Sequence, residues 1–426
     1  MPKKYWVFIF ALIYWCNASI LGHKHQLEYM YSDEEGYYLY LPAVFIYGTF
    51  EHIPVRTTSE YKPYPGTHKI ATRFTYGVAL LVLPFFLVAH ALRWVQGFSL
   101  DDPFAVQYSV AILVAACFYV TLGLYFLQGV LLRHFKNRYL IGLTLFLVFF
   151  GTNILYYTSR VAGMSHPYTF FLVSALLYYL PVLYREPSGR NALRIGIILG
   201  TIALVRPTNL IFVPFALCYD IRGKQDMVGR MNWMARHFKT LSMIPLVMAL
   251  LAIPQMAYWH YLSGKYLLNT YSELLGQRFY WTKPHLFQVF FDLCNGFFVY
   301  TPLMALAVCG ILMMAHKNVG NGRLLAVTFA GMAYVLSCWC QWWFGGAYGY
   351  RSFIDFYPLL AIGLCHYLHW AYATKPGWVW YCNLLLLSAF VFVNIRMVSF
   401  YYAFQVQADG TDSALFWGAL RKCLWL

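Results

Sequence analysis

Three consecutive acids, Asp33, Glu34 and Glu35, follow shortly after the first apolar segment of the chain. The chain has only 16 Asp and Glu residues among 426, and acids next to a membrane segment are costly to place there. An acid in the first turn complements the helix dipole, so a helix beginning at Asp33 would carry Tyr37 and Tyr40 on one face. A carboxylate flanked by aromatic rings suits a sugar pocket that presents a general base. We therefore expect Asp33 to be a base, Glu34 its support and Glu35 a solvated neighbour; the alternative is a surface helix with three solvated acids.

Two lysines lie further along the same stretch, Lys62 before Pro63 and Lys69 before Arg73. Lysine binds phosphate as a compact charge and arginine as a planar fork, so these cations suit the phosphate of a lipid-linked substrate. They suit anchoring to lipid head groups equally well.

Arg160 and His166 share a short polar loop, residues 159–167, between two apolar segments. The histidine can donate to a phosphate or a hydroxyl, or it can be satisfied by a backbone carbonyl. Arg206 precedes Pro207 inside the apolar stretch 191–219, where the proline predicts a break between two short helices that form a hairpin. An arginine at that depth should face a water-filled cavity or a partner, with a structural ion pair as the alternative.

A glycine-rich aromatic turn, residues 342–351, contains Tyr348 and ends at Arg351. Glycines allow the backbone to approach a ligand closely, and aromatic faces suit sugar rings. The simpler alternative is that Arg351 pairs with Asp355 four residues later. Arg278, in a second polar segment rich in Tyr and Trp, is a further candidate for phosphate binding.

The elements that must position these residues are membrane helices. The chain is 61% hydrophobic and 11% charged, with a mean hydropathy of +0.54, and its apolar runs are long enough to cross a bilayer. We predict an all-α polytopic membrane protein of about eleven transmembrane helices, forming a single domain over residues 1–426 with no separate soluble domain. Its two large outer loops are 22–103, with interfacial helices, and 262–295. Residues 73–91 are apolar enough to cross, but we favour an interfacial or re-entrant helix broken at Pro84.

The net charge of +15 follows the membrane topology. Six predicted inner loops hold 16 of the 31 Lys and Arg residues and only three acids, which is the positive-inside pattern. This pattern explains the basic balance, so no nucleic-acid partner is expected; the expected partners include membrane lipids. Ten cysteines show no CxxC or Cys/His spacing, so neither a disulfide framework nor a zinc site is predicted.

Taken together, four short motifs resemble those of the GT-C membrane glycosyltransferases. They are the acidic pair after the first span, Lys62-Pro63, Arg206-Pro207, and the Gly-Gly-x-Tyr-Gly-x-Arg turn at 345–351. Within that superfamily the chain most resembles the protein-mannosyltransferase and aminoarabinose-transferase branch. The resemblance implies a dolichyl- or undecaprenyl-phosphate-linked sugar donor, transfer on the periplasmic or lumenal side, and inversion at the anomeric carbon. Asp33 then matches the catalytic acid, Glu34 its neighbour, and Lys62 the lysine that approaches the carrier phosphate.

The chain departs from that family in the 159–167 loop, which offers Arg160 and His166 but no carboxylate. This departure favours chemistry without a metal or other cofactor, although it leaves a divalent metal open. The expected protein is a glycosyltransferase of the cell envelope, acting at the periplasmic face of a bacterial inner membrane on a glycan, lipid or protein acceptor. Its departing phosphate would be stabilised by Lys62, Arg206, Arg278 or Arg351. The rivals are a flippase for lipid-linked glycans, in which Arg206 binds substrate at a broken helix, and a glycan polymerase or ligase.

Overall fold

The computed structural model describes residues 6, 9–14, 30–55, 60–374, 376–402 and 413–424, so the predicted first outer loop lies partly outside the described residues. The first half of the described chain contains helices up to the predicted break near Pro207 and one two-stranded antiparallel sheet, in which Lys62 pairs with Ala71. These elements are α2 (Asp33–Tyr38), α3 (Tyr40–Phe45), β1 (Tyr61–Pro63), β2 (Ile70–Thr72), α4 (Gly77–Val95), α5 (Val106–His134), α6 (Arg138–Phe150), α7 (Ile154–Ser159), α8 (Ser165–Arg185) and α9 (Gly189–Val205).

The second half, as far as it is described, is also helical. Its elements are the 3₁₀ helix η1 (Pro207–Ile211), α10 (Phe212–Cys218), α11 (Lys224–Arg236), α12 (Phe238–Leu241), α13 (Met243–Ser263), α14 (Thr270–Leu275), α15 (Leu286–Phe291), α16 (Phe297–Tyr300), α17 (Leu303–His316), α18 (Gly322–Ser337), the 3₁₀ helix η2 (Arg351–Phe356), α19 (Tyr357–Thr374), α20 (Gly377–Tyr402) and α21 (Ser413–Leu424).

Apolar helices confirm the predicted all-α membrane architecture. Among the described residues, five helices are long and apolar enough to cross a bilayer: Gly77–Val95, Val106–His134, Ser165–Arg185, Phe238–Ser263 and Gly377–Tyr401. Four shorter apolar helices accompany them: Arg138–Phe150, Pro207–Cys218, Leu303–His316 and Gly322–Ser337. The protein is therefore an integral membrane protein with several helices of membrane-spanning length.

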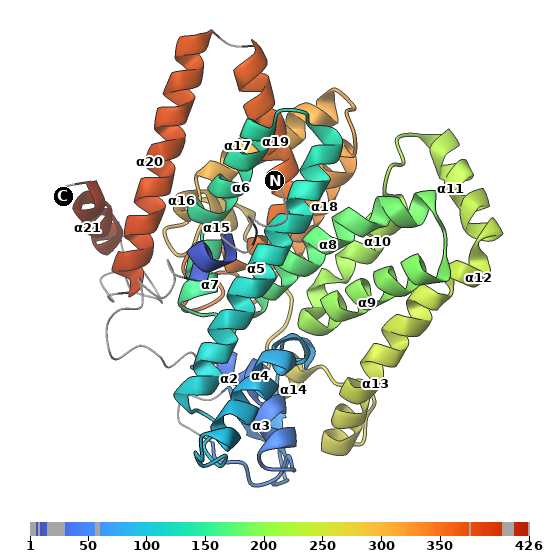
Figure 1. Cartoon of the computed structure of the whole chain (residues 1–426), viewed down its shortest axis with the longest axis vertical. Helices are drawn as coiled ribbons and strands as arrows, with labels where there is room; N and C mark the ends of the chain where they lie inside the picture. Colours follow the sequence, from blue (N-terminus) through green and yellow to red (C-terminus); the bar gives the residue numbers. More distant parts are fainter. Residues whose placement is uncertain are drawn as a thin grey trace.

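The core is built around α5 and α8, which pack along each other, and around the pair α17 and α19. Gly310 and Gly363 bring the second pair into backbone contact, because a Cβ on Gly310 would collide with the Gly363 carbonyl. By contrast, α13 packs mainly on α9, and only 6% of the apolar stretch within Phe238–Ser263, which α12 and α13 form together, is buried within the protein. In Figure 1, α11, α12 and α13 stand out on one side of the bundle and α20 and α21 on another.

Helix α4 runs through Pro84 without interruption, so the predicted break at this proline is wrong. The helix lies antiparallel to the first half of α5: His90 Nδ1 is 2.7 Å from the Tyr108 hydroxyl, and the Tyr119 hydroxyl donates to the Leu81 carbonyl. Neighbouring helices and their polar side chains allow membrane helices to accommodate a proline. Whether α4 lies at the interface or crosses the bilayer stays a prediction.

The predicted helix break near residue 206 is confirmed. Helix α9 ends at Val205, and Arg206 is extended, with φ −150° and ψ 111°. The residue before a proline avoids helical backbone because the proline ring crowds it, so Pro207 forces this geometry and then begins η1. The side chain of Arg206 is thereby turned toward η2 rather than continuing along α9.

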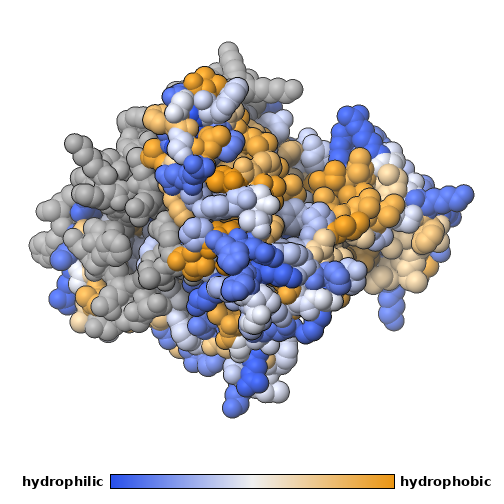
Figure 2. All heavy atoms as spheres, turned by 90° about the horizontal axis from the view of Figure 1, so that it is seen from below, coloured by the Kyte–Doolittle hydropathy of each residue, from blue (hydrophilic) through white to orange (hydrophobic). Residues whose placement is uncertain are grey.

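The lower end of the molecule holds α2, α3 and α4 (Figure 1), and Figure 2 views it from below. Hydrophilic residues gather at the centre of this face, and apolar residues occupy the middle of the arm that extends to the right, with hydrophilic residues at its edges. Helices α9 and α13 carry exposed apolar side chains, namely Leu193, Ile197, Leu246, Leu250 and Ile253. Such a surface suits contact with lipid tails.

Candidate active site

The Asp33 carboxylate lies between two arginines that come from distant parts of the chain. Its Oδ1 accepts from Arg73 Nη2 at 2.5 Å, and its Oδ2 accepts from Arg351 Nη2 at 2.9 Å. Arg73 Nη2 also lies 3.3 Å from Glu60 Oε2. The side chains of Asp33, Arg73 and Arg351 are 13%, 14% and 16% exposed, so the group is mostly buried but reaches the surface. We call Asp33, Glu60, Arg73 and Arg351 the Asp33 cluster.

Short local structures bring these side chains together. As predicted, α2 begins at Asp33, and the preceding Ser32 takes a left-handed φ of 54° and donates from its hydroxyl to Glu60. Arg73 directly follows β2, whose Thr72 hydroxyl donates to the Gly36 carbonyl at 3.0 Å and so ties the strand to α2.

Arg351 is delivered by the glycine-rich turn. Gly349 has a φ of +66°, which favours glycine, and a Cβ there would lie 2.8 Å from Tyr300 Cβ. The turn is therefore pressed against α16, and η2 begins immediately afterwards at Arg351. This placement explains why the segment needs a glycine at position 349.

The charges of the cluster determine the state of Asp33. Burial raises the pKa of Asp33, but the guanidinium groups of Arg351 and Arg73 lower it more, and the net shift is below the ordinary value. Asp33 is therefore an ion-paired carboxylate, and the alternative of a solvated surface helix is wrong.

The two following acids differ from Asp33 and from each other. Glu34 is 3% exposed, and its Oε1 accepts the Gly163 N–H at 2.7 Å. Burial raises the pKa of Glu34 well above its ordinary value despite that hydrogen bond. Glu35 is fully buried, so its predicted solvation is wrong: the first turn of α2 is turned into the protein. Glu34 thus brings a carboxyl to the 159–167 loop, which has none of its own.

Aromatic rings line the neighbourhood of the Asp33 cluster. Tyr37 stacks on Phe74 with ring centroids 4.0 Å apart, and Tyr271 of α14 meets Phe74 edge to face. The Arg73 guanidinium lies 5.0 Å and 5.7 Å from the Phe74 and Tyr271 ring centroids. The Thr270 hydroxyl also donates to the Arg73 carbonyl, so the start of α14 packs on the cluster.

A second buried ion pair lies beside this one, centred on Asp355. The Asp355 carboxylate accepts from Arg206 Nη1 at 3.1 Å and Asn209 Nδ2 at 2.8 Å, and lies 3.1 Å from His166 Nδ1. Arg206 also donates to the Ser352 hydroxyl at 3.1 Å. Asp355 itself is 0% exposed. We call these five residues the Asp355 cluster.

This second cluster decides two alternatives that the sequence left open. Arg206 and His166 both have an acidic partner, so the histidine is not held by a backbone carbonyl and the arginine has a structural ion pair. The pairing of Arg351 with Asp355 is wrong, because Asp355 contacts Arg206 while Arg351 contacts Asp33. The 3₁₀ geometry of η2 replaces the α-helical spacing on which that alternative depended.

The other predicted site residues lie outside both clusters. Lys62 and Arg278 are exposed, and Arg278 donates to the Tyr280 hydroxyl. Lys69 Nζ donates to the Tyr261 carbonyl at 2.8 Å. Tyr348 is buried, with its hydroxyl donating to Asn394, and Arg160 is a buried residue at the end of α7.

Sequence patterns did not single out Glu60, Asn209 or Asp355 as parts of a site. A signal for Asp355 was present, because an acid within an apolar stretch requires a partner. No local pattern pointed to Asn209 or to the shared use of Arg73 by two acids. In the part of the chain that is described, no group of three or more His, Cys, Asp or Glu side chains is arranged to hold a metal ion.

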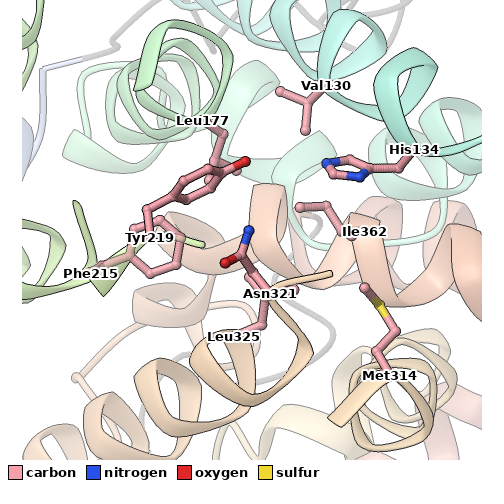
Figure 3. A pocket seen from close by; sticks show the side chains of 9 residues that line it. All are labelled: Val130, His134, Leu177, Phe215, Tyr219, Met314, Asn321, Leu325 and Ile362. Carbon is pink, nitrogen blue, oxygen red and sulfur yellow. The ribbon is translucent and has the colours of Figure 1, made fainter. Parts of the chain in front are cut away.

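A separate pocket lies near the other end of α5 (Figure 3). Figure 3 shows the polar groups of His134, Tyr219 and Asn321 directed into a space between apolar side chains of α5, α8, α10, α17, α18 and α19. Val130 of this pocket lies about 27 Å along α5 from Ile112, which neighbours Glu34. No acid lines this pocket, so it lacks the acid and arginine pair of the Asp33 cluster.

Comparison with known proteins identifies the fold. The chain matches no protein-family model and no curated protein by sequence. Among solved structures it is similar to the archaeal oligosaccharyltransferase AglB from Archaeoglobus fulgidus, in complex with an inhibitory peptide and a dolichol-phosphate, with a TM-score of 0.52 and 14% sequence identity. The chain has a GT-C fold. The match covers 96% of this chain and 57% of AglB, so this chain spans just over half the length of that protein.

Both clusters are thus formed where elements of the GT-C fold converge. The Asp33 cluster joins α2, the end of β2 and η2, and the Asp355 cluster joins the start of α8, the α9–η1 break and the same η2. Arg351, Ser352 and Asp355 of η2 contribute to one cluster or the other, so this short helix connects the two.

Proposed function

We propose that this protein is an integral membrane glycosyltransferase that moves a sugar from a polyprenyl-phosphate carrier to an acceptor hydroxyl, with inversion at the anomeric carbon. The observation that carries the proposal is the Asp33 carboxylate held between Arg73 and Arg351 in a GT-C fold. One side chain of this group can accept a proton, and two cations can bind a phosphate. These are the two groups that displacement of a phosphate-linked sugar requires.

In this reaction Asp33 takes the proton of the acceptor hydroxyl while that oxygen attacks the anomeric carbon. Arg73 and Arg351 bind the phosphate that leaves. The Tyr37, Phe74 and Tyr271 rings beside the cluster supply faces on which a sugar ring can stack. The exposed Lys62 serves an earlier step, attracting the anionic carrier to this face.

The chemistry proposed is metal-independent. Both Asp33 oxygens are already bonded to guanidinium groups, which supply the positive charge that a metal ion would otherwise provide. The proposed location is a bacterial inner membrane with the site facing the periplasm. Support comes from the predicted inner loops, which concentrate Lys and Arg away from the segment that contains Asp33.

The test is transfer by the purified protein in lipid nanodiscs, supplied with sugar-labelled undecaprenyl-phosphate pentose and hexose donors and a cell-envelope extract as acceptor. We expect label to leave the lipid in a reaction that Asp33→Asn abolishes. Full activity of that variant would overturn the role of Asp33. Movement of intact labelled lipid across liposomes without bond cleavage would instead identify a flippase, and chain extension of a lipid-linked glycan would identify a polymerase.

A further inference from the structure

The two arginines of the Asp33 cluster are the nearest cations to the proposed base and also the proposed phosphate ligands. Within the described residues, Arg351 makes an ion pair with Asp33 alone, and Arg73 makes ion pairs with Asp33 and Glu60. In this arrangement both oxygens of Asp33 accept hydrogen bonds. Each oxygen keeps a free lone pair, but two guanidinium groups that stabilise the anion make Asp33 a weak base until at least one arginine moves away.

We infer that Arg73 and Arg351 are exchanged between Asp33 and the phosphate of the lipid donor, so that donor binding itself releases the base. The inference rests on the proposed function and adds an order of events: the donor binds first, and only then can the acceptor be deprotonated. Without donor the base stays in its ion pairs.

The exchange keeps the charge of the site constant through the reaction. The proton of the acceptor hydroxyl goes to Asp33, which changes from −1 to 0. The acceptor oxygen forms a bond to the anomeric carbon, the bond from that carbon to the phosphate oxygen breaks, and its electron pair stays on the phosphate. The phosphodiester of charge −1 thus becomes a phosphate monoester approaching −2. The two guanidinium groups stabilise the anion that is growing at the moment the other anion disappears.

Exposure supports mobility of this pair over that of its neighbour. The arginines of the two clusters are similarly exposed, but the Asp33 carboxylate reaches the surface, whereas Asp355, the acid that holds Arg206, is completely enclosed. Arg206 is also bonded to Ser352. An incoming phosphate can therefore compete for Arg73 and Arg351, because the Asp33 carboxylate that loses an arginine is still in contact with solvent. The same competition for Arg206 would leave the enclosed Asp355 carboxylate without its charged partner.

The inference makes an unusual prediction about affinity. If Asp33 competes with phosphate for the arginines, Asp33→Asn binds undecaprenyl phosphate more tightly than the native protein does, by about tenfold, the effect of one charge-assisted hydrogen bond. If Asp33 only orients the arginines toward the phosphate, the same variant binds more weakly. Undecaprenyl phosphate is the right probe because it carries no sugar and cannot react.

The experiment measures dissociation constants of undecaprenyl phosphate for the full chain in nanodiscs. The variants are Asp33→Asn, Arg351→Gln and Glu60→Gln, each checked by thermal unfolding. The matched control is Glu273→Gln, because Glu273 lies on α14 beside the cluster but pairs with Lys265. We expect tighter binding for Asp33→Asn, weaker binding for Arg351→Gln, a smaller tightening for Glu60→Gln and no change for the control.

Each other outcome has a separate meaning. Unchanged or weaker binding by folded Asp33→Asn overturns the exchange, and so does equal tightening by Glu273→Gln, which would indicate a general charge effect. If Asp33→Asn does not fold, Glu60→Gln takes its place, since it removes the more exposed acid from Arg73, and the absence of tightening there overturns the exchange. Failure of the native protein to prefer undecaprenyl phosphate over undecaprenol would overturn the proposed donor class instead.

Discussion

The Asp33 and Asp355 clusters use the same residue types for different ends. In the first, one acid is shared by two arginines and every member reaches the surface. In the second, one acid is completely buried and contacts an arginine, an asparagine and a histidine. Both clusters depend on η2, which contributes Arg351 to the first cluster and Asp355 to the second.

This difference suggests that the Asp33 cluster binds substrate and that the Asp355 cluster supports the fold. A fully buried carboxylate with several donors is costly to disturb, because removing one member leaves the others desolvated and unpaired. A partly exposed carboxylate with two charged partners can exchange one of them for a ligand at a smaller cost. The Asp33 cluster is therefore the candidate for chemistry, and the Asp355 cluster holds η2 so that Arg351 reaches Asp33.

The largest expected effect is on catalysis at Asp33. Asp33→Asn should lower the rate of transfer by about 10² to 10⁴-fold, the usual contribution of a general base, because an amide cannot accept the proton. Glu60→Gln removes another partner of Arg73 but no base, and should retain more than about a tenth of the rate. Single-turnover transfer of labelled sugar measures both; similar losses in the two variants would erase the distinction between base and neighbouring acid.

The next effect is on stability at Asp355. Asp355→Ala should lower the free energy of unfolding by about 3 to 5 kcal/mol, because it removes the fully buried acid that pairs with Arg206, Asn209 and His166. The exposed Asp226, which accepts the Arg222 N–H, provides the control: Asp226→Ala should change stability by no more than about 0.5 kcal/mol. Denaturant unfolding in detergent makes the measurement. A small loss of unfolding free energy in Asp355→Ala would show that the Asp355 cluster does not have the structural role that distinguishes it from the Asp33 cluster.

A milder pair of substitutions compares the two arginines directly. Arg351→Lys should weaken undecaprenyl phosphate binding by about tenfold, because lysine offers no planar fork, while changing thermal stability little. Arg206→Lys should lower stability by about 1 to 2 kcal/mol, because lysine cannot reach both Asp355 and Ser352 in the same way. The reverse pattern, with Arg206 controlling affinity and Arg351 controlling stability, would exchange the roles of the clusters.

The smallest effect concerns pH and Glu34. Because burial raises the pKa of Glu34 above the ordinary 4.5, the protonated carboxyl is favoured by folding. Its contribution to stability is complete below pH 4.5 and is lost as the pH rises through the pKa of the folded protein. Glu34→Gln, which keeps an oxygen for the Gly163 N–H, should flatten this decline in thermal unfolding measured from pH 4 upward. An unchanged slope in that variant, with Glu273→Gln as the control, would assign the decline to another group.

Some of the fold and the site followed from local patterns. Pro207 ended a helix at Val205, and the acids at 33–35 began one at Asp33, because both effects act within a turn of backbone. The break predicted at Pro84 is wrong, because a local pattern does not include packing: α4 packs along α5 and stays continuous through the proline. The predicted solvation of Glu35 is wrong because no local pattern revealed that the first turn of α2 faces the protein interior.

By itself, the sequence determined that this is a helical membrane protein, and it made an acid shortly after the first apolar segment, Asp33, the candidate base. Composition and the spacing of apolar residues are enough for that, since the bilayer imposes helices on any such chain. Only the tertiary structure decided which arginine meets which acid. Asp33 is 40 residues from Arg73 and 318 from Arg351, and Asp355 binds an arginine 149 residues away in preference to the one four residues away. Ion pairing depends on distance in space, and packing of the helices sets that distance.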